Sequence, residues 1–284
     1  MDLDTLHGVK VVTLAPNVPG PVAAARLRDL GAQVMKVEAP AGDPLALTAP
    51  AWYESLHRGM SVERLDLKSP AGRAALDAHL AEADVLLTSS RMSALDRLGL
   101  GWEALHRRFP QLVHVGIVGY PPPDDERAGH DLNYVAQLGL VDPPAMPKTL
   151  IADLAGAERA VSTALGLLLR RERGDGTHRE LVSLREAATV FGEPLAHGLT
   201  APDGVLGGTA GIYRLYQAHD GWVAVGALEP HFAARLRDLL GVSDFSVRTF
   251  TPKFLGQSAQ AWQIWGIEND VPVSVVSESV TPVT

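Results

Sequence analysis

The chain has 284 residues, of which 46% are hydrophobic and 20% are charged, as is typical of a globular protein with a large buried core. Its formal net charge of −8 argues against a general binder of nucleic acids or of anionic membranes. The absence of cysteine excludes disulfides, thiolate catalysis and sulfur-ligated metals. The acidic N-terminus lacks the pattern of a signal peptide and no apolar run is long enough to span a membrane, so we expect a cytoplasmic protein with no membrane partner.

Short apolar runs alternate with helical patterns over the first two thirds of the chain. Strands are predicted at 10–14, 33–38, 64–67, 84–88, 112–117 and 179–184, and helices at 22–30, 70–81, 130–140 and 153–173. This alternation predicts an α/β fold with a parallel sheet covered on both faces, in which ligands bind at the carboxyl ends of the strands. No G-x-G-x-x-G follows the first strand and no P-loop motif occurs, so neither a dinucleotide site nor a P-loop is supported.

The composition changes near residue 204, where a glycine-rich turn begins. Around and after this turn we expect a helix at 185–197, an antiparallel hairpin of strands at 212–217 and 222–227, helices at 230–240 and 259–266, and an edge strand at 271–275. The predicted organisation is a large domain over 1–184, a linker helix segment over 185–203 and a small α/β domain over 204–284.

Four ionisable residues lie where loops meet helices or strand ends. His130 and Asp131 are adjacent at a predicted helix start, Asp153 is the predicted N-cap of the next long helix, and Glu229 precedes Pro230 at a strand end. An aspartate at an N-cap commonly serves only as a cap, which contributes about 1 kcal/mol. His130, Asp131 and Glu229 have equally ordinary interpretations as residues at helix starts. Spacing alone therefore favours a structural role for all four.

A series of short motifs runs through the chain in order: LHGVKVV from Leu6, GP at 20–21, LGAQVMKVE from Leu30, LDLKSPAG from Leu65, ADVLL from Ala83 and RLGLG from Arg97. Together they resemble the CoA-transferase family III, or CaiB/BaiF, superfamily. GHDLNY at 129–134 and VGALEPHF at 225–232 are similar to its α-methylacyl-CoA racemase branch, as are Gly207, Gly208, Tyr213 and Tyr216. The resemblance covers residues 6 to about 242, and more weakly 259–276.

This resemblance implies a large Rossmann-like domain, a small α/β domain, an intertwined homodimer and an acyl-CoA thioester substrate, with no cofactor beyond the coenzyme A of the substrate and no metal. It implies that His130 and Asp153 act on opposite faces of the α-carbon, with Glu229 beside the histidine. A second interpretation is a CoA-transferase that moves CoA between carboxylic acids with Asp153 as its nucleophile. A third is a catalytically impaired homologue that binds CoA ligands.

The residue types suit the chemistry of racemisation, which needs two acid/base groups within reach of one carbon. Histidine titrates near neutral pH, and Asp153 would need its pKa raised by burial or by a neighbouring acid. The backbone N–H groups of Leu154 and Ala155 are predicted to face the enolate oxygen. Basic residues at strand ends are expected to meet the phosphates of CoA. The candidate CoA-binding residues are Lys36, Arg58 and Arg91, with Asp131 in a supporting role.

The chain departs from the family pattern at several positions. His57-Arg58-Gly59-Met60 stands where Asn-Arg-Gly-Lys is usual, which removes one cation. The segment 119–123 replaces a Gly-x-Gly-Gln-x-Gly-Pro loop, so we expect one wall of the acyl site to differ. Glu158 and Arg159 replace glycines, and most of the segment that returns from the small domain to the large one is missing.

Overall fold

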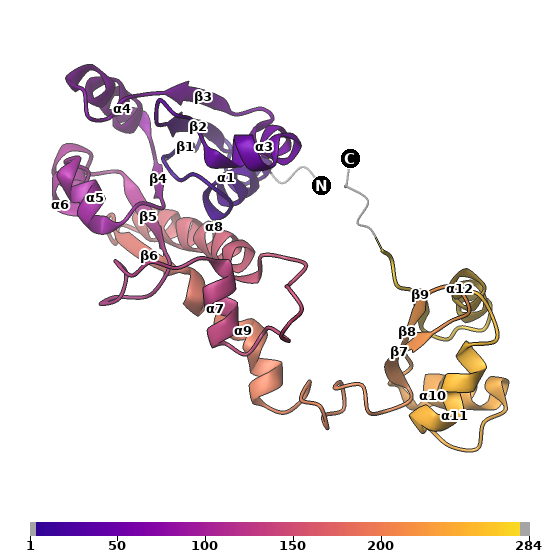
Figure 1. The fold of residues 1–284 in the computed structure, drawn as a ribbon. Coiled ribbons are helices and arrows are strands. Elements are labelled where there is room, and N and C mark those ends of the chain that lie inside the picture. The colour runs from indigo at the N-terminus through magenta and orange to yellow at the C-terminus, as the bar shows by residue number, and fades with distance from the viewer. Residues whose placement is uncertain (1–3, 279–284) are drawn as a thin grey trace. The chain divides into compact units, whose positions relative to one another are not determined.

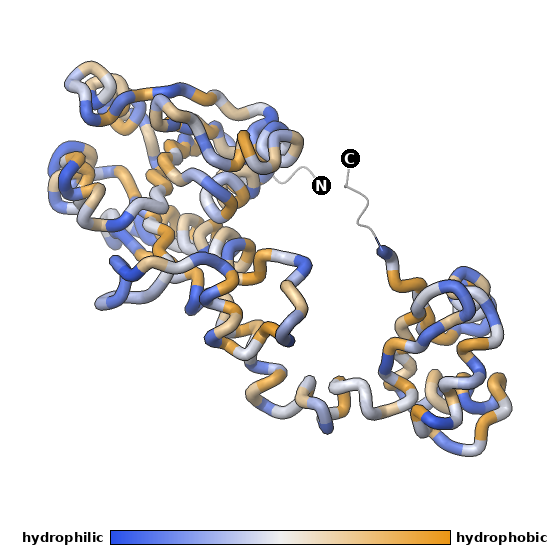
Figure 2. The backbone as a smooth tube through the Cα atoms, in the orientation of Figure 1, coloured by the Kyte–Doolittle hydropathy of each residue, from blue (hydrophilic) through white to orange (hydrophobic). Residues whose placement is uncertain are grey.

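The computed structural model of the chain describes residues 4–278. Its contacts divide the chain into two compact units, Met1–Gly192 (unit 1) and Glu193–Thr284 (unit 2). Each unit has its own sheet and its own hydrophobic core (Figure 1). Both units also contain hydrophobic stretches, coloured orange along the backbone in Figure 2.

Unit 1 is built on a six-stranded parallel sheet with the strand order β3-β2-β1-β4-β5-β6. The strands are β1 (Lys10–Thr13), β2 (Gln33–Glu38), β3 (Ser61–Arg64), β4 (Val85–Thr88), β5 (Val113–Val118) and β6 (Arg179–Ser183). The strand order reverses between β1 and β4. In doubly wound sheets such a switch point, at the carboxyl ends of the strands, is where ligands bind.

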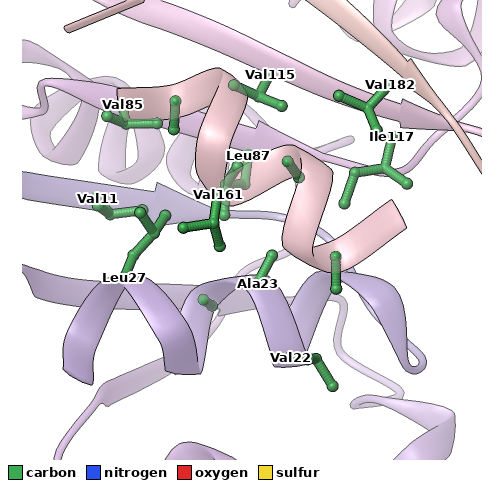
Figure 3. Packing of buried hydrophobic residues seen from close by; sticks show 14 of the residues in the cluster. Val11, Val22, Ala23, Leu27, Val85, Leu87, Val115, Ile117, Val161 and Val182 are labelled. Atoms are coloured by element: carbon green, nitrogen blue, oxygen red, sulfur yellow. The ribbon is translucent and has the colours of Figure 1, made fainter. Parts of the chain in front are cut away.

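Helices cover both faces of this sheet. The helices of unit 1 are α1 (Pro19–Asp29), α2 (Pro44–Thr48), α3 (Pro50–His57), α4 (Pro70–Glu82), α5 (Met92–Arg97), α6 (Trp102–Arg108), α7 (Asp131–Gln137), α8 (Ile151–Glu172) and α9 (Leu184–Ala196), the last of which runs into unit 2. On one face α1 and α8 pack side by side against strand residues such as Val85 and Leu87 (Figure 3). Fully buried alanines on both helices, Ala23 and Ala160 among them, permit this close approach. On the other face α4, α5 and α6 bury a second apolar cluster that includes Leu86.

Unit 2 is a smaller α/β unit with an antiparallel sheet in the order β7-β8-β9. Its elements are β7 (Tyr213–Gln217), β8 (Trp222–Gly226), α10 (Pro230–Leu240), α11 (Val247–Phe254), α12 (Ala259–Glu268) and β9 (Val273–Val275). One face of the sheet packs against the helices through an aromatic cluster, in which Tyr216 stacks on Phe254 and Phe254 contacts Trp262. Pro272 lies beside the edge strand β9, where its lack of an N–H group is tolerated.

The predicted fold class is confirmed: the large sheet is parallel and covered by helices, and the second unit is a smaller α/β unit. Two details were wrong. The third strand is Ser61–Arg64 rather than 64–67, because this edge strand is largely exposed and lacks the apolar pattern of a buried one. The helix α8 begins at Ile151, so Asp153 lies in its first turn and is not the N-cap.

Five helices were not predicted: α2, α3, α5, α6 and α11. Each has eight residues or fewer, which is too short for a helical period to stand out from the surrounding sequence. Within residues 4–278, no helix combines the length and the apolar character that crossing a membrane requires.

Candidate active site

A cavity of about 430 Å³ lies at the carboxyl edge of the large sheet, at the switch point between β1 and β4. The loops that follow β1, β4 and β5 form its walls, together with the first turn of α8. It is lined by Pro16, Asn17, Val18, Pro19, Ser89, Ser90, Arg91, Ile117, Val118, Gly119, Asp125, Arg127, Ala128, Gly129, His130, Tyr134, Asp153 and Leu184. The structure thus brings three of the predicted site residues, His130, Asp153 and Arg91, to one cavity.

The environment of this cavity changes the acidity of Asp153. Burial raises the pKa of its carboxyl group to about 6, and the negative charge of Asp131 adds to the increase. Within residues 4–192, the Asp153 carboxylate forms no hydrogen bond or ion pair. A carboxyl group with a pKa near 6 can both accept and donate a proton near neutral pH, which suits a general acid/base.

Asp131 holds the start of α8. Its side chain is buried, and Oδ1 accepts hydrogen bonds from the backbone N–H groups of Ala152, at 2.7 Å, and Asp153, at 3.0 Å. These are two of the N–H groups that a helix start leaves unpaired, and the apolar residue Leu150 at the N-cap cannot satisfy them. Asp131 was predicted to support CoA binding. The structure shows that its carboxylate binds the backbone of α8, and its part in CoA binding stays a prediction.

His130 is the N-cap of α7 and its side chain is exposed. Its backbone is fixed, since its N–H donates to Oδ1 of Asn133 at 3.0 Å and its carbonyl accepts from the backbone N–H of Asn133 at 2.8 Å. The imidazole forms no ion pair within residues 4–192. The backbone that carries the ring is held in place on the cavity wall.

The loop before His130 is the one that departs from the family pattern, and it forms part of the cavity wall. Glu126 connects this loop to α5, because its carboxylate accepts hydrogen bonds from the backbone N–H of Ser93 at 2.9 Å and from the Oγ of Ser93 at 2.8 Å. At its other end, Gly129 lies against Tyr120 and Tyr134, which meet edge to face with centroids 5.1 Å apart. A Cβ at Gly129 would lie 2.7 Å from the Tyr134 ring, so only glycine fits there.

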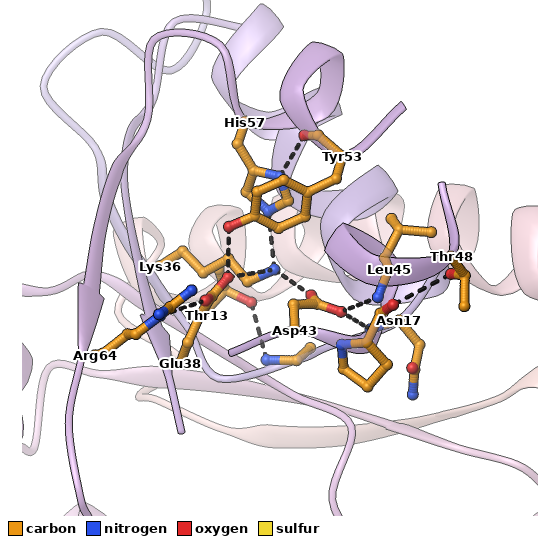
Figure 4. Close-up of polar contacts among 12 residues, drawn as sticks. Thr13, Asn17, Lys36, Glu38, Asp43, Leu45, Thr48, Tyr53, His57 and Arg64 are labelled. Atoms are coloured by element: carbon orange, nitrogen blue, oxygen red, sulfur yellow. Dashed lines mark hydrogen bonds and ion pairs between the residues drawn. The ribbon is translucent and has the colours of Figure 1, made fainter. Parts of the chain in front are cut away.

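A second cavity, of about 630 Å³, lies beside the first and shares Pro16 and Ser90 with it. Lys36 lines it, but the ammonium group is buried and ion-paired with Asp43, and it lies 3.5 Å from Oε1 of Glu38 (Figure 4). It also lies 2.9 Å from Nε2 of His57. Lys36 was predicted to meet a phosphate of CoA, yet in this structure a phosphate would have to compete with two carboxylates for it.

The remaining predicted site residues lie elsewhere. Arg58 is exposed after the end of α3 and lines neither of these two cavities. Glu229 belongs to unit 2, where it is exposed at the N-cap position of α10 and forms no side-chain capping hydrogen bond. Its partnership with His130 stays a prediction. Asn17 and Tyr134, which also line the first cavity, were not predicted as site residues.

The family model described as CoA-transferase family III matches residues 6–264. The chain belongs to CoA-transferase family III. Two relatives in this family differ in activity. Human α-methylacyl-CoA racemase is 33% identical over 263 residues, which cover 84% of this chain and 65% of the human enzyme. The cinnamoyl-CoA:phenyllactate CoA-transferase of Clostridium sporogenes is 35% identical over 178 residues, which cover 56% of this chain and 43% of that enzyme.

The fold of this family III chain also matches solved structures. A CaiB/BaiF family protein from Brucella suis aligns with a TM-score of 0.80 at 23% identity, over 96% of this chain and 84% of that one. The resemblance noted in the sequence is thus confirmed at the level of the family and the fold. The chain spans 65% of the length of the human racemase, and racemase and transferase relatives are similarly distant.

Proposed function

We propose that this family III protein racemises 2-methylacyl-CoA thioesters by 1,1-proton transfer between His130 and Asp153. The observation that carries the proposal is their arrangement. Both residues line one cavity at the carboxyl edge of the sheet, neither side chain forms an ion pair within residues 4–192, and the pKa of Asp153 is raised to about 6. A histidine and an aspartate within reach of one carbon can exchange the roles of acid and base.

The reaction consists of two proton transfers. In one direction the Asp153 carboxylate removes the α-proton, the electrons of the C–H bond form a C=C bond to the carbonyl carbon, and the carbonyl π electrons move to oxygen. The imidazolium of His130 then protonates the enolate on its opposite face. The thioester is restored with inverted configuration, and the enzyme is left with a protonated Asp153 and a neutral His130, which is the starting state for the reverse direction.

The second cavity is the proposed site for the remainder of CoA. It adjoins the first through Pro16 and Ser90 and is large enough for part of a nucleotide. Arg91, which follows Ser90 and has no ion-pair partner within residues 4–192, is the proposed phosphate contact. Arg58 stays a weaker candidate because it lines neither cavity. We further propose that Glu229 orients His130 and that the protein acts as a homodimer, as the resemblance implies.

The test is exchange of the α-proton of a 2-methylacyl-CoA for deuterium in heavy water, followed by NMR. We expect the wild type to exchange the α-proton of both enantiomers. Asp153→Asn should lose exchange of the enantiomer whose α-proton Asp153 removes, His130→Gln should lose exchange of the other enantiomer, and neither should racemise, with circular dichroism as the control for folding. Absence of exchange across a panel of 2-methylacyl-CoA substrates in a folded protein that binds CoA would reject racemisation. If no compound of a broad acyl-CoA panel is turned over either, the result would favour the alternative of a catalytically impaired CoA-binding homologue.

A CoA-transferase is the second candidate, and the unpaired carboxylate of Asp153 is the observation that favours it. Asp153 would attack the thioester carbonyl to form a mixed anhydride and release the CoA thiolate. The thiolate would then attack the aspartyl carbonyl, giving an aspartyl-CoA thioester and a free carboxylate. Hydroxylamine cleaves both adducts and leaves a hydroxamate on Asp153, which mass spectrometry detects. A hydroxamate that forms only with acyl-CoA present, without α-proton exchange, would select the transferase.

A further inference from the structure

The donors predicted for the enolate oxygen are not available in this structure. The N–H of Leu154 donates to the carbonyl of Leu150 at 3.1 Å. Ala155 is the fifth residue of α8, so its N–H pairs with the carbonyl of Ile151 in the helix. The two N–H groups before them bind Asp131. An enolate formed beside Asp153 therefore needs a donor from another element.

Asn17 is a residue of the same cavity with an open donor. It lies in the turn between β1 and α1, and its carboxamide forms no hydrogen bond within residues 4–192. Its φ is +66°, a conformation that only one other non-glycine residue adopts among residues 4–278. Uncommon backbone conformations often mark sites where the surrounding structure fixes a functional group. Asparagine also adopts this conformation more easily than most residues, so the conformation alone does not assign a role.

The backbone of Asn17 is fixed by Asp43. Oδ1 of Asp43 accepts the N–H of Asn17 at 3.0 Å and that of Leu45 at 2.9 Å, while its other oxygen is ion-paired with Lys36 (Figure 4). Asp43 and Lys36 are only 2% and 1% exposed, so water does not compete for these contacts. The next turn of the chain is tight, since a Cβ at Gly20 would lie 2.3 Å from the Cβ of Ala15. The turn thus holds Asn17 in one position on the cavity wall.

We propose that the carboxamide of Asn17 donates to the thioester oxygen and that Asp43 is its positioning residue. The proposal rests on the proposed proton transfer at Asp153. As the α-proton leaves, negative charge builds on the thioester oxygen and strengthens the N–H···O bond. The donor therefore stabilises the transition state more than the bound substrate and acts on kcat more than on KM.

Two substitutions at Asn17 test the carboxamide as a donor separately from the role of the residue in the turn. Asn17→Gly keeps the positive φ without steric cost and removes the carboxamide. Asn17→Asp keeps the size of the side chain but replaces the NH₂ donor by a carboxylate oxygen. We expect kcat to fall about 10²- to 10³-fold in both, the range for loss of one oxyanion donor. Thermal melting temperatures and KM should stay close to those of the wild type. Wild-type kcat in Asn17→Gly would show that asparagine serves only the turn.

The role of Asp43 is tested with a matched pair of double variants. Both Lys36→Met/Asp43→Asn and Lys36→Met/Asp43→Leu remove the buried ion pair, but only the first keeps an oxygen that can accept the N–H of Asn17. At saturating acyl-CoA we expect kcat of the leucine variant to lie about 10²-fold below that of the asparagine variant, the cost of a misplaced group. Both variants change the same wall of the second cavity, so any effect on CoA binding is shared by the pair. Equal kcat in the two folded variants would overturn the positioning role.

Binding of an enolate analogue tests the Asn17 donor independently of whether the protein racemises acyl-CoA. In N,N-dimethylcarbamoyl-CoA a nitrogen atom replaces the α-carbon. Resonance makes this nitrogen planar and places partial negative charge on the carbonyl oxygen, so the compound resembles the enolate. By calorimetry the wild type should bind this compound about tenfold more tightly than Asn17→Gly, whereas CoA should bind both equally. If the wild type exchanges no α-proton yet shows this difference, the proposed function fails and the donor stands. Equal affinity of the wild type and Asn17→Gly would overturn the donor.

Discussion

Two groups of ionisable residues lie at the carboxyl edge of the same sheet, and they differ in how their charges are balanced. In the cluster around Lys36, the ammonium group, Asp43 and Glu38 compensate one another, and Arg64 lies 3.6 Å from Glu38. In the neighbouring cavity, His130 and Asp153 have no such partners within residues 4–192. An ionisable group in a partly buried position without a partner costs stability, and such groups are concentrated at functional sites. The lack of ion-pair partners therefore favours His130 and Asp153, rather than the cluster around Lys36, as the reactive group.

The largest expected effect is the loss of activity in Asp153→Asn, which removes the unpaired acid and keeps its size. We expect exchange of the enantiomer whose α-proton Asp153 removes to fall about 10³- to 10⁴-fold, since general acid/base groups contribute up to this range. Exchange is measured by NMR at pH 7 with saturating substrate. Retention of more than a tenth of the wild-type rate would mean that Asp153 does not transfer the proton.

Lys36→Met tests the paired cluster. The substitution leaves the carboxylates of Asp43 and Glu38 buried without their cation, and we expect it to lower the free energy of unfolding by about 3 kcal/mol. Lys36→Met/Asp43→Asn should recover part of this loss, because it removes the charges of Lys36 and Asp43 and leaves only Glu38, which lies near Arg64. Lys68→Met, at an exposed lysine, is the control, with an expected change below about 0.5 kcal/mol. Urea unfolding measures all three, and an unchanged stability of Lys36→Met would refute the structural role of the ion pair.

The pH dependence of stability distinguishes Asp153 from the paired acids. Its pKa is raised to about 6 in the folded state from 3.8, so between these values the folded state binds more protons than the unfolded state. The contribution of Asp153 to stability is therefore fully present below pH 4 and is lost as the pH rises through 6. Relative to the wild type, Asp153→Asn should gain about 1 to 2 kcal/mol of unfolding free energy between pH 4 and pH 7. A constant difference across this range would contradict the raised pKa.

The smallest expected effect concerns the contact with CoA. Arg91→Gln should raise KM for acyl-CoA about tenfold through loss of a phosphate contact, while kcat stays within about threefold. The same variant should leave the rate with an N-acetylcysteamine thioester unchanged, because that substrate has no phosphate. Arg58→Gln is the matched comparison, since Arg58 lines neither cavity. If it raises KM as much as Arg91→Gln does, the assignment of these cavities to CoA is wrong.

The sequence predicted the order of the main elements because buried strands and long helices leave strong periodic patterns. It also predicted ligand binding at the carboxyl edge of the sheet, since that follows from the topology of parallel sheets, and the structure has a cavity at this edge. It missed the edge strand Ser61–Arg64, whose exposed residues show no apolar pattern. The boundary between unit 1 and unit 2, after Gly192, lies inside the segment 185–203 that was predicted as a linker.

Interactions between distant residues explain most of what was missed at the site. Asp131 binds backbone N–H groups 21 and 22 residues away, and Lys36 pairs with Asp43 only because the loop after β2 folds back. No local pattern reports such contacts. Asn17 did carry a signal, since an asparagine among prolines and a glycine favours a turn with positive φ, but the turn alone does not reveal that it lines the cavity.

The hydrogen bonds of Asp131 offer a way to change the pH range of the proposed proton transfer. The residue holds α8 through one oxygen, Oδ1, and raises the pKa of Asp153 through its charge. These two effects are separable, because Asp131→Asn keeps an oxygen in the same place and loses only the charge. This variant should keep the geometry of α8, lower the pKa of Asp153 and move the acidic limb of the pH–rate profile to lower pH. A single isosteric change could thus adapt the catalyst to more acidic conditions without rebuilding its cavity.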